Sequence, residues 1–125
     1  MLVLDSGGLS RLGARDRATA ALLIALRRQG LWPPVVPTMV LVESLTGAGS
    51  DANANRFLKI CELTADVPEG LARRAASLRA KAGRGSAVDA LTVATAEPGG
   101  HVLTSDPRDV GALAANAADV TVLPV

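Results

Sequence analysis

The sequence predicts an α/β fold: a three-layer sandwich with a mostly parallel central sheet. Short apolar runs alternate with segments of helical periodicity along all 125 residues, an order typical of parallel strands joined by helices. Apolar residues make up 49% of the chain and charged residues 20%, a balance that suits a packed core and is too apolar for disorder. We therefore expect one domain spanning residues 1–125.

The first half of the chain is expected to form short buried strands separated by helices. MLVL (1–4) is a purely apolar run, which predicts a strand covered on both faces, and Gly7 and Gly8 predict a loose turn soon after it. Asp16 can cap a helix over 18–29. The other expected elements are a very short strand within 33–37, a helix over 38–45, a helix over 53–63 that Asp51 can cap, and a weak strand or loop over 63–67.

The second half of the chain contains the two clearest helical segments. Pro68 and Gly83 mark the ends of a helix over 68–83. The segment 86–96 is helical and apolar on almost every side, which predicts a central, buried helix. We expect the rest of the chain to form a strand over 101–105, a helix over 106–117 and a last strand over 120–125.

Composition and charge exclude several classes of function. The chain has 13 basic and 12 acidic residues and a net charge of +1, so no strong overall field recruits nucleic acid or a membrane surface. Cys61 is the only cysteine, which excludes a disulfide framework and a thiolate metal cluster. The sequence has no signal-peptide pattern and no apolar stretch long enough to span a membrane. We therefore expect a cytoplasmic protein with no membrane partner.

Most of the 12 acidic residues have ordinary structural explanations. Those at expected helix starts suit the positive end of the helix dipole, and those at the ends of elements are expected to be solvated. These two groups are Asp16, Asp51 and Glu69, and Glu62, Glu97 and Asp119. Four other acids lie in apolar segments and are candidates for a functional site. They are Asp5, Glu43, Asp89 and Asp106.

Each of these four acids also has a structural alternative. Asp5 and Asp106 follow expected strands, so each can be a helix cap or a ligand. Glu43 can be a solvated helix position, although its neighbours on the same helical face are mostly apolar. Asp89 can form a capping box with Ser86. However, a carboxylate that enters so apolar a helix is expected to be half-buried and to need a cation.

Considered together, the four acids favour a metal site. The carboxyl ends of parallel strands open into one crevice, which would bring Asp5 and Asp106 together. Asp89 opens the helix before the second of these strands, and Glu43 can reach the same crevice. Carboxylates this close repel each other unless a cation neutralises them. All-oxygen ligands suit Mg²⁺ or Mn²⁺, and such a site suits nuclease chemistry.

Four segments of the chain resemble those of a known family. LVLDS, PTMVLVESL, SAVDALTVATA and VLTSDPRD occur in the order found in PIN domains, particularly VapC-like ribonuclease toxins of type II toxin–antitoxin systems. The resemblance covers essentially the whole chain and implies a metal-dependent endoribonuclease. In it, Asp5, Glu43, Asp89 and Asp106 would hold Mg²⁺ or Mn²⁺ for RNA cleavage, with Glu43 as a ligand or positioning the attacking water. It also implies a homodimer and a cognate antitoxin.

Residues around these acids receive supporting roles. By the same resemblance, Ser6 and Thr104 match positions where the family often has a small hydroxyl residue, and Asp109 could be an additional outer-shell acid. Among the basic residues that precede the third motif, Arg84 is the one that we expect to contact RNA phosphates. The lone histidine, His101, is expected to be structural.

Two alternatives to the nuclease remain from the sequence. A catalytically silent PIN-fold binding module would keep the same acids. A receiver-like signalling domain also gathers acids at strand ends, but it needs a lysine at the end of a late strand. Neither Lys59 nor Lys81 is placed there, so the receiver is the weaker alternative.

Overall fold

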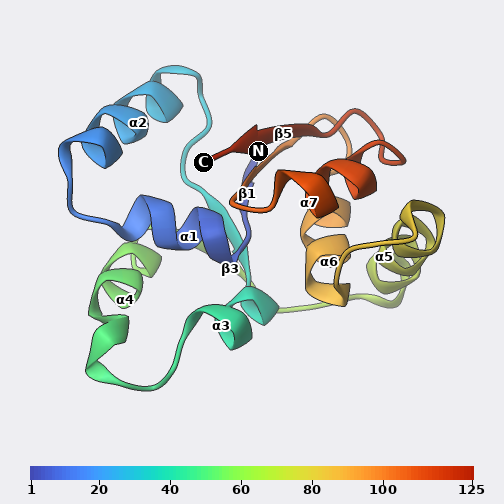
Figure 1. Ribbon diagram of the computed structural model, residues 1–125, viewed down its shortest axis with the longest axis horizontal. Coiled ribbons are helices and arrows are strands. Elements are labelled where there is room, and N and C mark those ends of the chain that lie inside the picture. The colour runs from blue at the N-terminus through green and yellow to red at the C-terminus, as the bar shows by residue number, and fades with distance from the viewer.

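A computed structural model describes all residues, 1–125, and shows a three-layer sandwich (Figure 1). Five parallel strands form the central sheet in the order β3-β2-β1-β4-β5. They are β1 (Leu2–Leu4), β2 (Val35–Pro37), β3 (Glu62–Thr64), β4 (His101–Thr104) and β5 (Thr121–Pro124). The predicted α/β class is confirmed, and every strand pair is parallel. The architecture is consistent with a PIN-like sandwich.

Side chains of the inner strands alternate between the two faces of the sheet. Leu2 and Leu4 of β1 belong to one core cluster, and Val3 between them belongs to the other. All three are fully buried, because helices cover this strand on both sides. That double covering explains why the first strand is a continuous apolar run instead of an alternating one.

Helices form the two outer layers of the sandwich, on opposite sides of the strands (Figure 1). The layer around Leu2 and Leu4 contains α1 (Ser6–Gly13), α2 (Arg17–Arg28), α3 (Thr38–Ser44) and α4 (Ala52–Leu58). The layer around Val3 contains α5 (Glu69–Ala82), α6 (Ala87–Ala96) and α7 (Pro107–Ala114). A single 3₁₀ turn, η1 (Gly49–Asp51), precedes α4. Helix α6 is mostly buried and packs against α5, α7 and β1, which confirms the predicted central helix.

Helix α1 is a feature that the hydrophobic pattern does not indicate. It begins one residue after Asp5, where the sequence predicts a loose turn. That prediction is wrong, because the two glycines serve close packing and not a turn. A Cβ at Gly7 would lie 1.9 Å from Ser105 Oγ, and one at Gly8 would lie 2.3 Å from the Leu103 carbonyl oxygen. The two glycines therefore allow the start of α1 to pack directly on the end of β4.

Several predicted boundaries also differ from the structure. The helix expected over 53–63 ends at Leu58, because the chain must turn there to begin β3 at Glu62, and this strand lies slightly earlier than 63–67. The helix expected over 106–117 ends at Ala114. By contrast, the caps at Asp16 and Gly83 are where the sequence predicts them.

Two acids have structural roles other than the predicted ones. Glu97 is not a solvated end: its carboxylate accepts hydrogen bonds of 2.8 and 2.7 Å from Arg74, because α5 and α6 pack side by side. This ion pair lowers the pKa of Glu97. The Asp51 side chain does not cap α4. It accepts hydrogen bonds from Thr46 and Gly47 instead.

Candidate metal centre

The candidate site lies where the sheet changes its winding direction, between β1 and β4. These strands are adjacent and parallel, with Leu4 opposite Leu103, yet they are far apart in the sequence. Asp5 follows β1 directly, and Asp106 comes two residues after the end of β4. In open parallel sheets, the crevice at such a switch point is the usual place for ligands. The topology therefore brings two of the four predicted acids to one edge.

Asp5 is a buried carboxylate whose charge is only partly compensated. It is 5% exposed and caps α1, with its Oδ1 accepting a 2.7 Å hydrogen bond from the Gly8 amide. Burial raises the pKa of Asp5, hydrogen bonds with Thr104 and Gly8 lower it, and the charge of Asp89 raises it; the net shift is upward. Cap and candidate ligand are thus compatible roles for this residue, and burial, the main cause of its raised pKa, disfavours its charged form.

Thr104 connects the two acid-bearing segments. It is the last residue of β4 and is fully buried. Its hydroxyl oxygen accepts a 2.8 Å hydrogen bond from the Asp106 amide, and the same side chain lowers the pKa of Asp5. Thr104 therefore holds the start of the chain that leads into α7 and lies close enough to Asp5 to affect its pKa.

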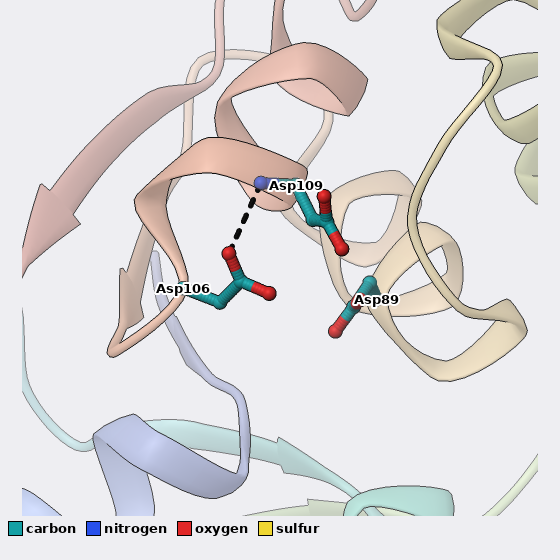
Figure 2. Close-up of side chains that lie close together, drawn as sticks. All are labelled: Asp89, Asp106 and Asp109. Carbon is teal, nitrogen blue, oxygen red and sulfur yellow. Dashed lines mark hydrogen bonds between the residues drawn. The ribbon is translucent and has the colours of Figure 1, made fainter.

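Three carboxylates come together beside this pair of strands (Figure 2). Asp89, Asp106 and Asp109 each offer an oxygen, and these oxygens lie within 4.8 Å of one another. Asp106 caps α7 by accepting a 3.1 Å hydrogen bond from the Asp109 amide, which is the dashed line in Figure 2. Such a group of carboxylates could hold a metal ion. Asp109, predicted as an outer-shell acid, lies within the cluster itself.

Asp89 is held in place by a complete capping box. Its Oδ2 accepts a 3.0 Å hydrogen bond from the Ser86 amide, and its own amide donates a 3.0 Å bond to Ser86 Oγ. The carboxylate is half-buried, as the sequence predicts. Asp89 also acts electrostatically on both Asp5 and Glu43. It is therefore the residue that relates the cluster in Figure 2 to the other two predicted acids.

Glu43 lies outside the tight cluster but within the influence of its charges. It is an exposed residue of α3. Burial, followed by the charges of Asp89 and Asp5, raises the pKa of Glu43. Of the four predicted acids, Asp89 and Asp106 belong to the closest group, and the charge of Asp89 acts on the other two.

Arg84 is a cation positioned against the cluster. Its Nε lies 2.5 Å from Asp109 Oδ1, and both side chains are only partly exposed. Nothing in the sequence indicates this pairing, because the two residues are 25 positions apart and on either side of β4. Arg84 therefore compensates the charge of Asp109. Asp89 and Asp106 form no ion pair.

The donor set of this site fits a hard divalent cation. All the candidate ligands are carboxylate oxygens, a set that suits Mg²⁺, Mn²⁺ or Ca²⁺ and does not suit soft metals. Burial is the main cause of the raised pKa values of Asp5 and Glu43, and the neighbouring acids add to it.

Other chemistry-bearing residues do not form a competing centre. Burial raises the pKa of the Cys61 thiol to about 11, so this cysteine is not an activated nucleophile. His101 begins β4, at the opposite end of that strand from Asp106, and its Nδ1 is buried without a hydrogen-bond partner. Lys59 and Lys81 lie at the end of α4 and within α5. Neither follows a strand, as a receiver-like site would require.

No model of a known protein family matches the chain, and a search of curated proteins finds no match. None of the helices is both long and apolar enough to cross a membrane.

Proposed function

We propose that this chain is a metal-dependent endoribonuclease of the PIN-domain, VapC-like type. The observation that carries the proposal is the cluster of acids from α6 and the start of α7 at the switch point of a parallel sheet, where Asp5 follows β1. Acids in this arrangement, with no thiol or imidazole among them, suit phosphodiester hydrolysis better than acyl transfer or redox chemistry. The four sequence segments that resemble PIN domains agree with this choice.

Asp5, Asp89 and Asp106 would hold Mg²⁺ or Mn²⁺, with Glu43 as a further ligand or as the group that orients water. When bound, the cation supplies charge stabilisation to the phosphate and lowers the pKa of coordinated water. The protein's own contribution is rigidity. The Ser86 capping box fixes Asp89, and the Gly8 amide fixes Asp5. Hydrogen bonds from neighbouring groups keep metal ligands in the orientation that catalysis needs.

Glu43 is the residue best suited to accept a proton from the attacking water. It is exposed on α3, so it can meet both solvent and a bound strand. In the metal-free protein, burial and the charges of Asp89 and Asp5 raise its pKa, and its carboxylate can accept a proton. Arg84, at the rim of the site, would contact a phosphate of the RNA.

The proposal includes the partners that the family resemblance implies. A VapC-like protein would act on RNA in the cytoplasm, would form a homodimer and would be inhibited by a cognate antitoxin. The near-neutral net charge of +1 fits this picture only if local groups supply the RNA affinity. Those groups would be the metal site and Arg84.

The direct test compares wild type with Asp89→Asn, assayed for RNA cleavage in Mn²⁺ and in EDTA. We expect cleavage by wild type in Mn²⁺ alone, and a loss of roughly 100-fold or more in Asp89→Asn. Asp66→Asn is the matched control, because Asp66 is an exposed acid outside the site. Growth arrest on induced expression should follow the same pattern.

Two outcomes would overturn the nuclease proposal. One is cleavage by wild type that persists in EDTA. The other is equal toxicity of wild type and Asp89→Asn together with no cleavage of any RNA in Mn²⁺, which would favour a silent binding module.

A further inference from the structure

A polar groove lies next to the acids, between α1, α3 and the start of α4. Its volume is about 440 Å³, within the usual range of roughly 300–1,000 Å³ for ligand pockets. Its lining includes Glu43, one of the predicted acids, and Ser6, which directly follows Asp5 in the chain. The groove therefore continues from the candidate metal centre.

The walls of the groove are held rigidly. Buried Asp51 accepts four hydrogen bonds of 2.7–3.0 Å, three of them from the amide and hydroxyl of Thr46 and one from the Gly47 amide. These bonds fix the loop between α3 and α4. On the opposite wall, Arg56 donates a 3.0 Å hydrogen bond to the Gly13 carbonyl, which ties α4 to α1. The groove is thus a formed feature of the fold.

The side chains in the groove are suited to hydrogen bonding without positive charge. Ser10, Ser50 and Asn53 line it and are exposed, so their hydroxyl and amide groups are available to a ligand. The only charged lining residues are acids, Glu43 and Asp51. Phosphate would be repelled from such a surface, whereas the neutral edge of a nucleobase could bind.

The geometry points to a subsite for one unpaired nucleobase of the RNA, next to the scissile phosphate. This inference rests on the proposed nuclease function and extends it to substrate selection. The phosphate lies at the acids, and the adjoining base enters the groove, where Asn53 and the serines read its hydrogen-bonding edge. Single-stranded RNA is the required substrate class, because a base paired in a helix cannot enter the groove.

The test uses two asparagines of the same helix. Asn53 lines the groove and Asn55 does not, and both are exposed. Asn53→Trp should fill the subsite and lower kcat/KM in Mn²⁺ by about tenfold or more, the size of one lost base contact. With a random-sequence RNA pool, wild type and Asn55→Trp should share a base preference on one side of the cut, and Asn53→Trp should lose it.

A second substrate separates the subsite from general damage to the enzyme. An RNA with an abasic nucleotide at the preferred position should be cleaved about tenfold more slowly by wild type. The same change should not slow Asn53→Trp further, because its subsite is already closed. The inference is overturned if both Trp variants behave alike, or if the abasic RNA slows wild type and Asn53→Trp equally.

An NMR titration without metal tests the groove independently of catalysis. Uncharged nucleosides should shift the Asn53 side-chain amide signals, and inorganic phosphate should not. Shifts caused by phosphate alone, or by neither probe, would contradict the subsite. If nucleosides bind but wild type cleaves no RNA, the nuclease proposal fails while the nucleobase site stands.

Discussion

Two buried aspartates, Asp51 in the wall of the polar groove and Asp5 next to the lining residue Ser6, are held in contrasting ways. Asp5 and Asp51 are 5% and 6% exposed, yet the pKa of Asp5 is raised and that of Asp51 is lowered. For Asp51, hydrogen bonds from Thr46 and Gly47 outweigh the effect of burial. For Asp5, burial and the charge of Asp89 outweigh the hydrogen bonds it receives.

The difference shows how a structural acid can be distinguished from a candidate ligand. A buried carboxylate that receives enough donors from its own chain stabilises a loop and needs no ion. A buried carboxylate that faces other acids is left with uncompensated charge, which a cation can neutralise. The two aspartates should therefore respond oppositely to the same substitution.

The largest expected effect is on activity. We expect Asp5→Asn to lower Mn²⁺-dependent RNA cleavage by roughly 100-fold or more, because it removes a proposed ligand. The amide oxygen can still accept the hydrogen bond from Gly8, so the fold should be retained. Cleavage rates and urea unfolding curves measure the two effects.

Asp51→Asn should have the opposite effect, a loss of stability without a loss of activity. It should lower the Tm by about 5–10 °C, because a neutral amide cannot accept all the hydrogen bonds from Thr46 and Gly47. At a temperature where it is folded, it should cleave RNA at close to the wild-type rate. Equal losses of activity in both variants would remove the distinction between them.

The next effect concerns the close packing that places Asp5. Gly8→Ala should destabilise the protein by about 1–3 kcal/mol or more, because the new Cβ would meet the Leu103 carbonyl at 2.3 Å. Gly70→Ala is the control: its helix is exposed there and no atom lies within 4 Å of the new Cβ. That variant should be neutral or slightly stabilised. Urea unfolding should show this contrast, and equal behaviour of the two variants would contradict the packing account.

Much of this fold and part of the site could be predicted from the sequence. Continuous apolar strands, helix caps and alternation are local signals, so the parallel sheet and the positions of Asp5 and Asp106 at strand ends followed from them. The packing of Gly7 and Gly8 on β4 could not be foreseen, because it depends on Leu103 and Ser105, almost 100 residues away.

Contacts between side chains far apart in the sequence could not be predicted either. Arg84 and Asp109, like Arg74 and Glu97, meet only after helices pack. The position of Asp51 in the sequence predicts a helix cap, yet its carboxylate accepts hydrogen bonds from the preceding loop instead. Ser10 and Asn53 carry no pattern at all, and the groove that they line is visible only in three dimensions.

The pH dependence of folding stability also distinguishes the two aspartates. Because the pKa of folded Asp51 is lowered, its stabilisation is full above the ordinary value of 3.8 and is lost as the pH falls through the folded pKa. The pKa of folded Asp5 is raised from 3.8, so its ionisation destabilises the metal-free fold as the pH rises through that interval.

Urea unfolding between roughly pH 2 and 7 measures both effects. Asp51→Asn should lose its disadvantage at the acid end of this range. Asp5→Asn should gain stability over wild type as the pH rises from 3.8, with a constant difference at neutral pH. Parallel profiles for the two variants would contradict the opposite pKa shifts.

The smallest expected effect comes from Arg84. Arg84→Gln removes a positive charge from beside Asp109, so Mn²⁺ affinity should rise by about threefold to fivefold. The proposed phosphate contact would be lost, so KM for RNA should increase. Arg73→Gln is the control, since its ion pair with Glu69 is fully on the surface. An unchanged Mn²⁺ affinity would show that Arg84 does not act on the site.

The central claim is that the acids at the β1–β4 edge bind a divalent cation. Mn²⁺ titration followed by electron paramagnetic resonance tests it on wild type, Asp89→Asn and Asp51→Asn. We expect saturable binding by wild type, the same affinity in Asp51→Asn, and a loss of about tenfold or more in Asp89→Asn. Absence of binding by wild type, or unchanged affinity in Asp89→Asn, would contradict the account.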